Sequence, residues 1–195
     1  MKRILTLLIA GIVCLNAAFP ANSIEKGRRL RIVSYNVGAA IAPHIRVIGT
    51  HSLSLPQNDG AEPRACIITE CEGFVFASTH LDHVSETARM EQLELVTACM
   101  TEKYGDTDIP VFLCGDLNAE PGSSTILLLD KNWKRLSPEK ATEPSEAPSA
   151  CIDYIAVLRN GADCDVRRSK VCRRLRHGNT RTASDHLPVL VEIIY

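Results

Sequence analysis

The stretch from Pro110 to Ser124, PVFLCGDLNAEPGSS, combines a short apolar run with two polar side chains that suit chemistry, Asp116 and Asn118. The apolar run predicts a buried strand, and the turn that follows holds a carboxylate and an amide at the end of that strand. If strand geometry continues, both side chains point to one side, where they could hold a metal ion, a water or a phosphate. The alternative is a tight turn closed by an Asx-type hydrogen bond.

Similar polar residues stand at the ends or inside other predicted strands. Each one has a structural explanation when taken alone, but a sheet that gathers these ends would place them in one crevice. The residue types suit metal-assisted hydrolysis of a phosphate ester, because Asp and Asn oxygens bind Mg²⁺ or Mn²⁺ and His moves protons near neutral pH. The set comprises Asn36, His80, Asp116, Asn118, Asp153, Asp185 and His186. Within it, Asp153 could fix the tautomer of His186.

The elements that must position these residues follow from the sequence pattern. A helix is predicted from an N-cap at Ser85 to about Tyr104, and a short helix after Ser123 or Ser124. Gly38 to Arg64 predicts loops with one short strand near residues 45–48, and residues 137–149 predict a polar surface loop. Together the elements predict an α/β (α+β) sandwich. Besides 110–114, strands are predicted over 29–37, 65–69, 74–79, 151–158, 165–172 and 187–195.

Residues 1–23 predict a signal peptide, because Lys2 and Arg3 precede an apolar run that is short for a membrane span and is followed by small residues. The chain is then exported to a periplasmic or extracellular location without stable membrane insertion. Residues 24–195 form one domain by length. The net charge of the whole chain is -1.

Seven cysteines remain after residue 23, an odd number, so at least one thiol is free or pairs between chains. Cys66 with Cys71, or Cys164 with Cys172, are candidate disulfides in an oxidising compartment. The spacing fits no zinc site built on cysteine pairs, and the sequence contains no Gly-x-Ser-x-Gly, P-loop or HExxH motif.

Residues 166–181 carry seven basic side chains and no acidic one. Such a patch attracts phosphates and favours a polyanion partner such as nucleic acid. The alternative is a solvated basic hairpin without such a partner. The basic residues are Arg167, Arg168, Lys170, Arg173, Arg174, Arg176 and Arg181.

Five short motifs occur in order along the chain, between Ser34 and Val189. Together they resemble the successive motifs of the endonuclease/exonuclease/phosphatase superfamily, which has the DNase-I-like fold. The resemblance implies a two-sheet sandwich flanked by helices, with the site at one edge. The motifs are SYNV at 34–37, STHLD at 78–82, GDLN at 115–118, IDYI at 152–155 and SDHLPV at 184–189.

By position in these motifs, the resemblance implies that Asn36 and Asp185 serve the metal. Asp116 then positions or deprotonates the attacking water, and Asn118 orients it and the phosphate. His80 stabilises the phosphate or acts as a general acid.

The resemblance also pairs Asp153 with His186, and the proton of the water goes to Asp116 or to His186. Arg89 is a candidate phosphate-binding residue, with an ordinary surface position as the alternative.

One departure from the family pattern stands out. Relatives have a helix and a strand ending in a Gln-Glu pair between the first two motifs, and its glutamate is the chief metal ligand. No such pair occurs here, so one helix-strand unit is missing.

Two hypotheses follow: an exported Mg²⁺-dependent phosphate-ester hydrolase, or a catalytically impaired or truncated relative that binds nucleic acid or another polyanion. A secreted structural module would leave the polar set unexplained.

Overall fold

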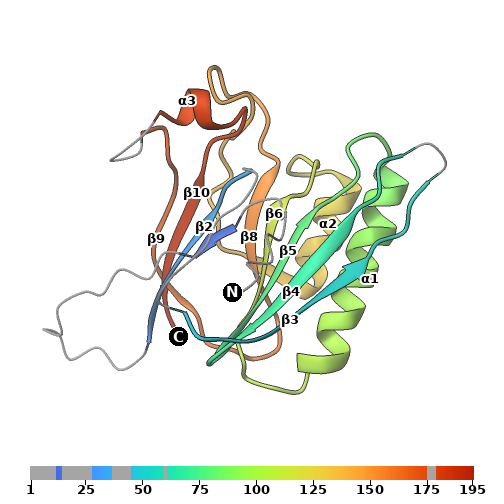
Figure 1. Ribbon diagram of the computed structural model, residues 1–195, viewed down its shortest axis with the longest axis vertical. Helices are drawn as coiled ribbons and strands as arrows, with labels where there is room; N and C mark the ends of the chain where they lie inside the picture. The colour runs from blue at the N-terminus through green and yellow to red at the C-terminus, as the bar shows by residue number, and fades with distance from the viewer. Residues whose placement is uncertain (1–11, 15–27, 37–44, 59–60, 175–178) are drawn as a thin grey trace, which may run out of the picture.

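The computed structural model describes residues 12–14, 28–36, 45–58, 61–174 and 179–195, which fold into two β-sheets packed face to face with helices on one outer side (Figure 1). This is the predicted α+β sandwich. Figure 1 shows the smaller sheet beside the larger one, with α1 and α2 beyond the larger sheet.

The larger sheet has six strands in the order β3-β4-β5-β6-β8-β7. Only the β5 and β6 pair is parallel, and the other neighbours are antiparallel. The bounds are β3 Val47–Ser54, β4 Ala65–Cys71, β5 Phe74–His80, β6 Val111–Asp116, β7 Trp133–Arg135 and β8 Asp153–Leu158.

The smaller sheet has four antiparallel strands in the order β1-β2-β10-β9. They are β1 Ile12–Cys14, β2 Arg29–Ser34, β9 Asp165–Val171 and β10 Val189–Ile194. β1 belongs to the segment predicted to be a signal peptide, and the rest of that segment lies outside the described residues. Its removal on export therefore stays a prediction.

The helices begin where the sequence provides caps. α1, Glu86–Tyr104, starts at the predicted N-cap Ser85, whose hydroxyl accepts a hydrogen bond from Ala88 N. α2, Ser124–Asn132, starts at Ser123 in the same way. The four-residue α3, Thr180–Ala183, lies in the basic stretch. None of the helices in the described ranges is long and apolar enough to cross a membrane.

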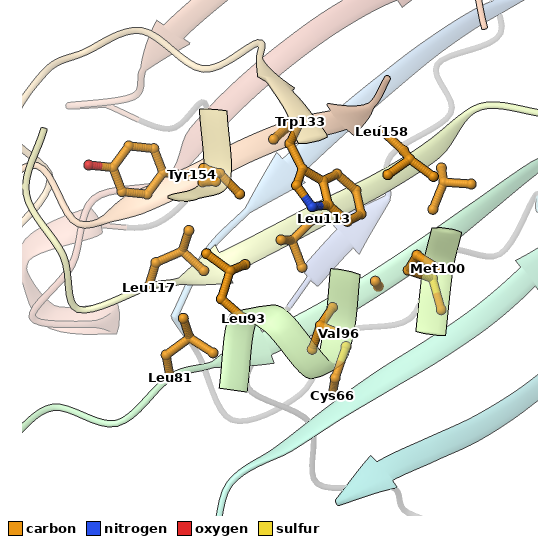
Figure 2. Packing of buried hydrophobic residues seen from close by; sticks show 14 of the residues in the cluster. Cys66, Leu81, Leu93, Val96, Met100, Leu113, Leu117, Trp133, Tyr154 and Leu158 are labelled. Carbon is orange, nitrogen blue, oxygen red and sulfur yellow. The ribbon is translucent and has the colours of Figure 1, made fainter. Parts of the chain in front are cut away.

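Two hydrophobic cores hold these layers together. The outer core lies between the larger sheet and the helices, where Leu93, Val96 and Met100 of α1 meet Leu113 and Trp133 (Figure 2). The inner core fills the space between the sheets with side chains from β2, β5, β6, β8 and β10. β6 and β8 supply both cores because successive side chains on a strand face opposite ways, which explains their continuous apolar runs.

Several details differ from the sequence predictions. β3 runs for eight residues where mainly loops were expected; it is an edge strand with mostly exposed side chains, so it lacks an apolar pattern. Thr142 and Ser145 are buried although residues 137–149 were predicted to form a surface loop. The proposed disulfides are wrong, because all seven cysteines from Cys66 to Cys172 are free thiols.

The register of the larger sheet aligns three candidate site residues. His80 at the end of β5 pairs with Asp116 at the end of β6, and Asp116 pairs with Asp153 at the start of β8. Gly115 makes this register possible: its φ is +137°, and a Cβ there would lie 1.8 Å from the carbonyl oxygen of Thr79. Only glycine fits such a close backbone approach.

We expect Gly115→Ala to destabilise the chain by about 4 kcal/mol or more, because backbone and not a flexible side chain blocks the new methyl group. Gly122→Ala is the matched control: Gly122 also has a positive φ, of +88°, but no atom lies within 4 Å of the added Cβ. It should cost about 1–2 kcal/mol for the conformation alone. Equal losses for the two variants in urea unfolding would contradict the steric explanation.

Candidate functional site

The candidate site lies where the larger sheet meets the loop before β10. Three strands bring His80, Asp116 and Asp153 into one row, and the loop of the smaller sheet adds His186. His186 Nδ1 lies 2.8 Å from Asp153 Oδ2, and its Nε2 lies 3.7 Å from Asp116 Oδ2. The predicted convergence of these four residues is therefore observed.

Asp153 holds His186 in place with help from Thr142. Asp153 is 1% exposed, and its Oδ2 accepts a hydrogen bond of 2.6 Å from the Thr142 hydroxyl as well as the contact with His186 Nδ1. The Thr142 carbonyl also accepts from Leu187 N, one residue beyond His186. Thr142 thus fixes both partners, although its place in a predicted loop gave no sign of this role.

Asp116 is held by the turn that follows β6. Its Oδ1 accepts a hydrogen bond of 2.9 Å from Asn118 N, which is the Asx-type turn considered for this motif. The strand does not continue, because Asn118 has a φ of +48°. Instead the Asn118 amide donates to the Leu81 carbonyl at 3.0 Å and so ties the ends of β5 and β6 together.

Burial and neighbouring charges push the pKa values of Asp116 and His186 upward. Burial is the main cause for Asp116, and the charge of Asp153 adds to it, so that its pKa rises to about 7. For His186, burial lowers the pKa, but the hydrogen bond and charge of Asp153, with the charges of Asp116 and Asp185, outweigh it and raise the pKa to about 9. At neutral pH His186 is a cation between carboxylates.

His80 behaves in the opposite way. Burial, together with the positive charges of Arg64 and His186, lowers its pKa to about 4, so the imidazole is neutral at pH 7. Its Nε2 lies 3.3 Å from Asp116 Oδ2. A neutral imidazole can stabilise a phosphate oxygen through an N–H group, but it holds no spare proton to act as a strong general acid.

Arg64 is a second residue that sequence reasoning missed. It directly precedes β4, its side chain is only 10% exposed, and its charge acts on both His80 and Asp116. One terminal nitrogen contacts Glu62 and His83 at 3.1 Å each, while Nε is buried without a hydrogen-bond partner among the described residues. A cation beside a neutral imidazole is suited to an incoming anion. No recognisable motif surrounds Arg64, so only its position in space reveals it.

Asn36 and Asp185, the predicted metal residues, meet at the Ser184 hydroxyl. That hydroxyl donates to the Asn36 carbonyl and lies 3.4 Å from Asp185 Oδ1. The Asp185 side chain is 80% exposed. Oxygen donors that are open to solvent fit Mg²⁺, which keeps several waters when it binds to proteins. The contact with Asn36 is through its backbone carbonyl, so metal binding by the Asn36 side chain and Asp185 stays a prediction.

A second group of potential ligands is buried. Asp116, Asp153 and His186 each offer one ligand atom, and these atoms lie within 4.8 Å of one another.

The Arg89 guanidinium is bound to backbone and not to a residue of this site. Its Nη1 donates to the backbone carbonyl of Asp82 at 3.1 Å, and its Nε is buried without a partner among the described residues. Asp82 in turn accepts hydrogen bonds from Val84 N and Ser85 N and shapes the turn into α1. Phosphate binding by Arg89 stays a prediction.

In the metal-free protein, we expect His186 to titrate near pH 9 and Asp153→Asn to lower that pKa, because the variant removes the negative charge at Nδ1. Since the folded pKa exceeds the ordinary value of 6.5, the stabilisation by Asp153 is complete below pH 6.5 and is lost as the pH rises through 9. NMR titration of the His186 imidazole measures this pKa in both proteins. Asp163→Asn, an exposed control, should leave the His186 pKa unchanged; a His186 pKa at or below 6.5 in the unsubstituted protein would refute the prediction.

Comparison with solved structures gives the following likenesses. A mannosyl-6-phosphatase from Bacteroides thetaiotaomicron matches with a TM-score of 0.65 and 21% identity over 77% of this chain and 67% of its own. An endonuclease/exonuclease/phosphatase family protein from the same organism matches with a TM-score of 0.62 and 22% identity, over 77% and 66%. D. rerio TDP2, complexed with a single-strand DNA product, gives a TM-score of 0.57 and 13% identity, over 77% and 69%.

The sequence itself matches no family model and no curated protein. The chain spans about two thirds of the length of the first two structures, in keeping with a missing helix-strand unit. These likenesses concern the fold, and they agree with the five motifs and the two-sheet architecture described above. The chain therefore has the DNase-I-like fold of the endonuclease/exonuclease/phosphatase superfamily.

Proposed function

We propose that this chain is an exported, Mg²⁺-dependent hydrolase of phosphate esters, acting as a phosphodiesterase, endonuclease or phosphatase. The observation that carries the proposal is the row of His80, Asp116 and Asp153 closed by His186, because it places a base, an acid and a phosphate-binding group within a few ångströms. Proteins of the same fold include one named as a phosphatase and one bound to a DNA product.

Asp116 is the proposed base that removes the proton of the attacking water. Its pKa of about 7 suits a group that must accept a proton near neutral pH. His186, with a pKa of about 9, already carries a proton and therefore serves as the acid that stabilises or protonates the developing oxyanion. The electrostatics thus favour Asp116 over His186 as the base, the point that the motifs left open.

His80 and Arg64 are the proposed phosphate-binding residues. A neutral His80 donates through an N–H group, and Arg64 supplies the positive charge close to it. Mg²⁺ held by Asp185 and Asn36 would add positive charge that polarises a phosphoryl oxygen. The positive charges of His186 and Arg64 both act on Asp116.

Two parts of the proposal, export and contact with nucleic acid, are based on the sequence. Export follows from residues 1–23, and contact with nucleic acid follows from the basic stretch. The exposed side chains of Arg167 and Arg168 on β9, and of Arg173 and Arg174 beyond it, support that contact. Arg167 also pairs with Asp165 at 3.2 Å, which reduces its charge toward a partner.

The second candidate is a catalytically impaired relative that binds polyanions. The absence of the Gln-Glu pair and the exposed arginines on and after β9 favour it. This reading requires DNA binding that weakens steeply with salt, without turnover of any phosphate ester.

Asp116→Asn should reduce kcat for a generic phosphodiester or phosphomonoester by about 100-fold to 10,000-fold, because an amide cannot accept the proton. Chelation of divalent ions should abolish the same activity. Asp163→Asn, an exposed change of the same kind, should leave kcat as it is. Hydrolysis that tolerates both Asp116→Asn and a chelator would rule out the proposed mechanism.

Arg64→Gln should lower kcat/KM by about 10-fold to 100-fold, because the variant loses a charged hydrogen bond to the phosphate. Arg159→Gln, an exposed arginine after β8, is the matched control. Steady-state kinetics on a soluble phosphate ester measures both, and circular dichroism checks that each variant folds. An Arg64→Gln enzyme with unaltered kcat/KM would remove Arg64 from the phosphate site.

A further inference from the structure

A cavity of about 500 Å³ opens between α3 and the loop that joins β7 to β8, directly beside the candidate site. Figure 1 shows these two segments side by side at one end of the molecule. One wall is formed by residues 144–147 and the other by residues 182–185. The proposed mechanism gives this cavity no role, although its volume is in the range of small-molecule binding sites.

Hydrogen bonds fix the two walls of the cavity to each other and to the loop before β10. Ser145 N donates to the Asp185 carbonyl at 2.5 Å, and the Ser145 hydroxyl donates to the Ser184 carbonyl at 2.9 Å. Leu187 N donates to the Thr142 carbonyl at 2.7 Å. The walls are thus held together where they join the site, independently of any ligand.

Asp185 links the cavity to the proposed phosphate-binding region. It lines the cavity, and its Oδ1 lies 4.0 Å from His186 Nε2, which itself lies 3.7 Å from Asp116 Oδ2. The proposed function puts the reacting phosphoryl group beside Asp116. The cavity is therefore close enough to receive the alcohol group of the substrate, which leaves when the ester is hydrolysed.

The residues around the cavity disfavour nucleobases and additional phosphates. None of the eight described residues that line it is aromatic, so a base would find no side chain there to stack on. None of these eight is Lys or Arg, whereas Glu146 and Asp185 place one carboxylate on each wall. A polyanion such as a nucleic-acid strand would therefore be repelled from the cavity.

The same lining suits a neutral group that carries several hydroxyls. The Glu146 side chain is exposed, so its carboxylate can accept hydrogen bonds from hydroxyl groups. Ala147 and Ala183 offer small apolar contacts to the carbon atoms between those hydroxyls. A cationic group fits less well, because His186, a cation at neutral pH, already lies 4.0 Å from the Asp185 carboxylate.

We propose that this cavity binds a leaving group that carries several hydroxyls, so that the chain prefers phosphate esters of sugars or other polyols over nucleic acids. Glu146 is then a specificity-determining residue, because its carboxylate accepts hydrogen bonds from the leaving group. The inference rests on the proposed function for the position of the phosphoryl group. Ligand binding can nevertheless be measured without turnover.

Three ligands test this preference in the full chain, with a chelator present to prevent the proposed hydrolysis. They are inorganic phosphate, D-glucose 6-phosphate and cyclohexylmethyl phosphate, which has a six-membered ring and a phosphate like the sugar ester but lacks its hydroxyls. Titration followed by NMR measures the three dissociation constants. The value for D-glucose 6-phosphate should be lower than either of the others by about 10-fold or more, because only this ligand forms the hydroxyl hydrogen bonds.

Glu146→Gln should weaken the binding of D-glucose 6-phosphate by about 3-fold to 10-fold, because the accepting group loses its charge, and should leave inorganic phosphate binding unchanged. Ala147→Phe should fill the cavity and remove the advantage of the sugar phosphate. Ala98→Phe, a change of the same size at an exposed position of α1, is the matched control and should bind all three ligands as the unsubstituted chain does.

No detectable binding of D-glucose 6-phosphate, affinity equal to that of cyclohexylmethyl phosphate, or a sugar preference that survives in Ala147→Phe would each overturn the proposal. Tighter binding of phosphoethanolamine would also overturn it, because the cavity would then select a cation.

The outcome for the cavity is separable from the outcome for the proposed function. A preference for hydroxyls that Ala147→Phe abolishes, found in a chain that hydrolyses no phosphate ester, would uphold the binding site while the proposed function fails. Hydrolysis of an aryl phosphate by a chain without that preference would refute the binding site while the proposed function stands.

Discussion

The contact between Asp153 and His186 joins the two halves of the molecule and makes the rest of the site possible. Asp153 begins β8 in the larger sheet, whereas His186 precedes β10 in the smaller one. Both groups are buried, and an ionised carboxylate left alone there would be strongly unfavourable. Losing one partner of such a buried pair typically costs about 3–5 kcal/mol. The packing of one sheet on the other is thus coupled to the chemistry at their edge.

The same contact explains the unusual electrostatics around Asp116. Asp153 lies in the neighbouring register position, so two carboxylates are crowded together in a poorly solvated place. His186 compensates both by carrying a proton, and its position between them raises its pKa. His80, on the other side of Asp116 and close to Arg64, remains neutral instead. Burial and neighbouring charges thereby give the two imidazoles in one site different protonation states.

Sequence patterns predicted most of this architecture because the decisive signals are local. Apolar runs that end in a polar residue gave the strands carrying His80, Asp116 and Asp153, and the cap at Ser85 gave the start of α1. The convergence of the motif residues was predicted for the same reason. Thr142 and Arg64 were missed, because their partners are tertiary and nothing in the adjacent sequence distinguishes them. Only the start of β3 was predicted, as a short strand near residues 45–48, because an exposed edge strand needs no alternating pattern.

The free thiols have a consequence for how this chain tolerates oxidation. Six of the seven cysteines are buried, and burial raises the pKa of Cys66 to about 12 and of Cys71 and Cys164 to about 11. A thiol reacts with oxidants and disulfides as its thiolate, which is scarce when the pKa is this high. Once folded, the protein shields six of the seven sulfur atoms between Cys66 and Cys172 from mispairing, and none of these seven described thiols forms a crosslink. The buried thiols are exposed to oxidants only while the chain is unfolded. Rapid formation of the two hydrophobic cores therefore prevents thiol oxidation as well as stabilising the fold.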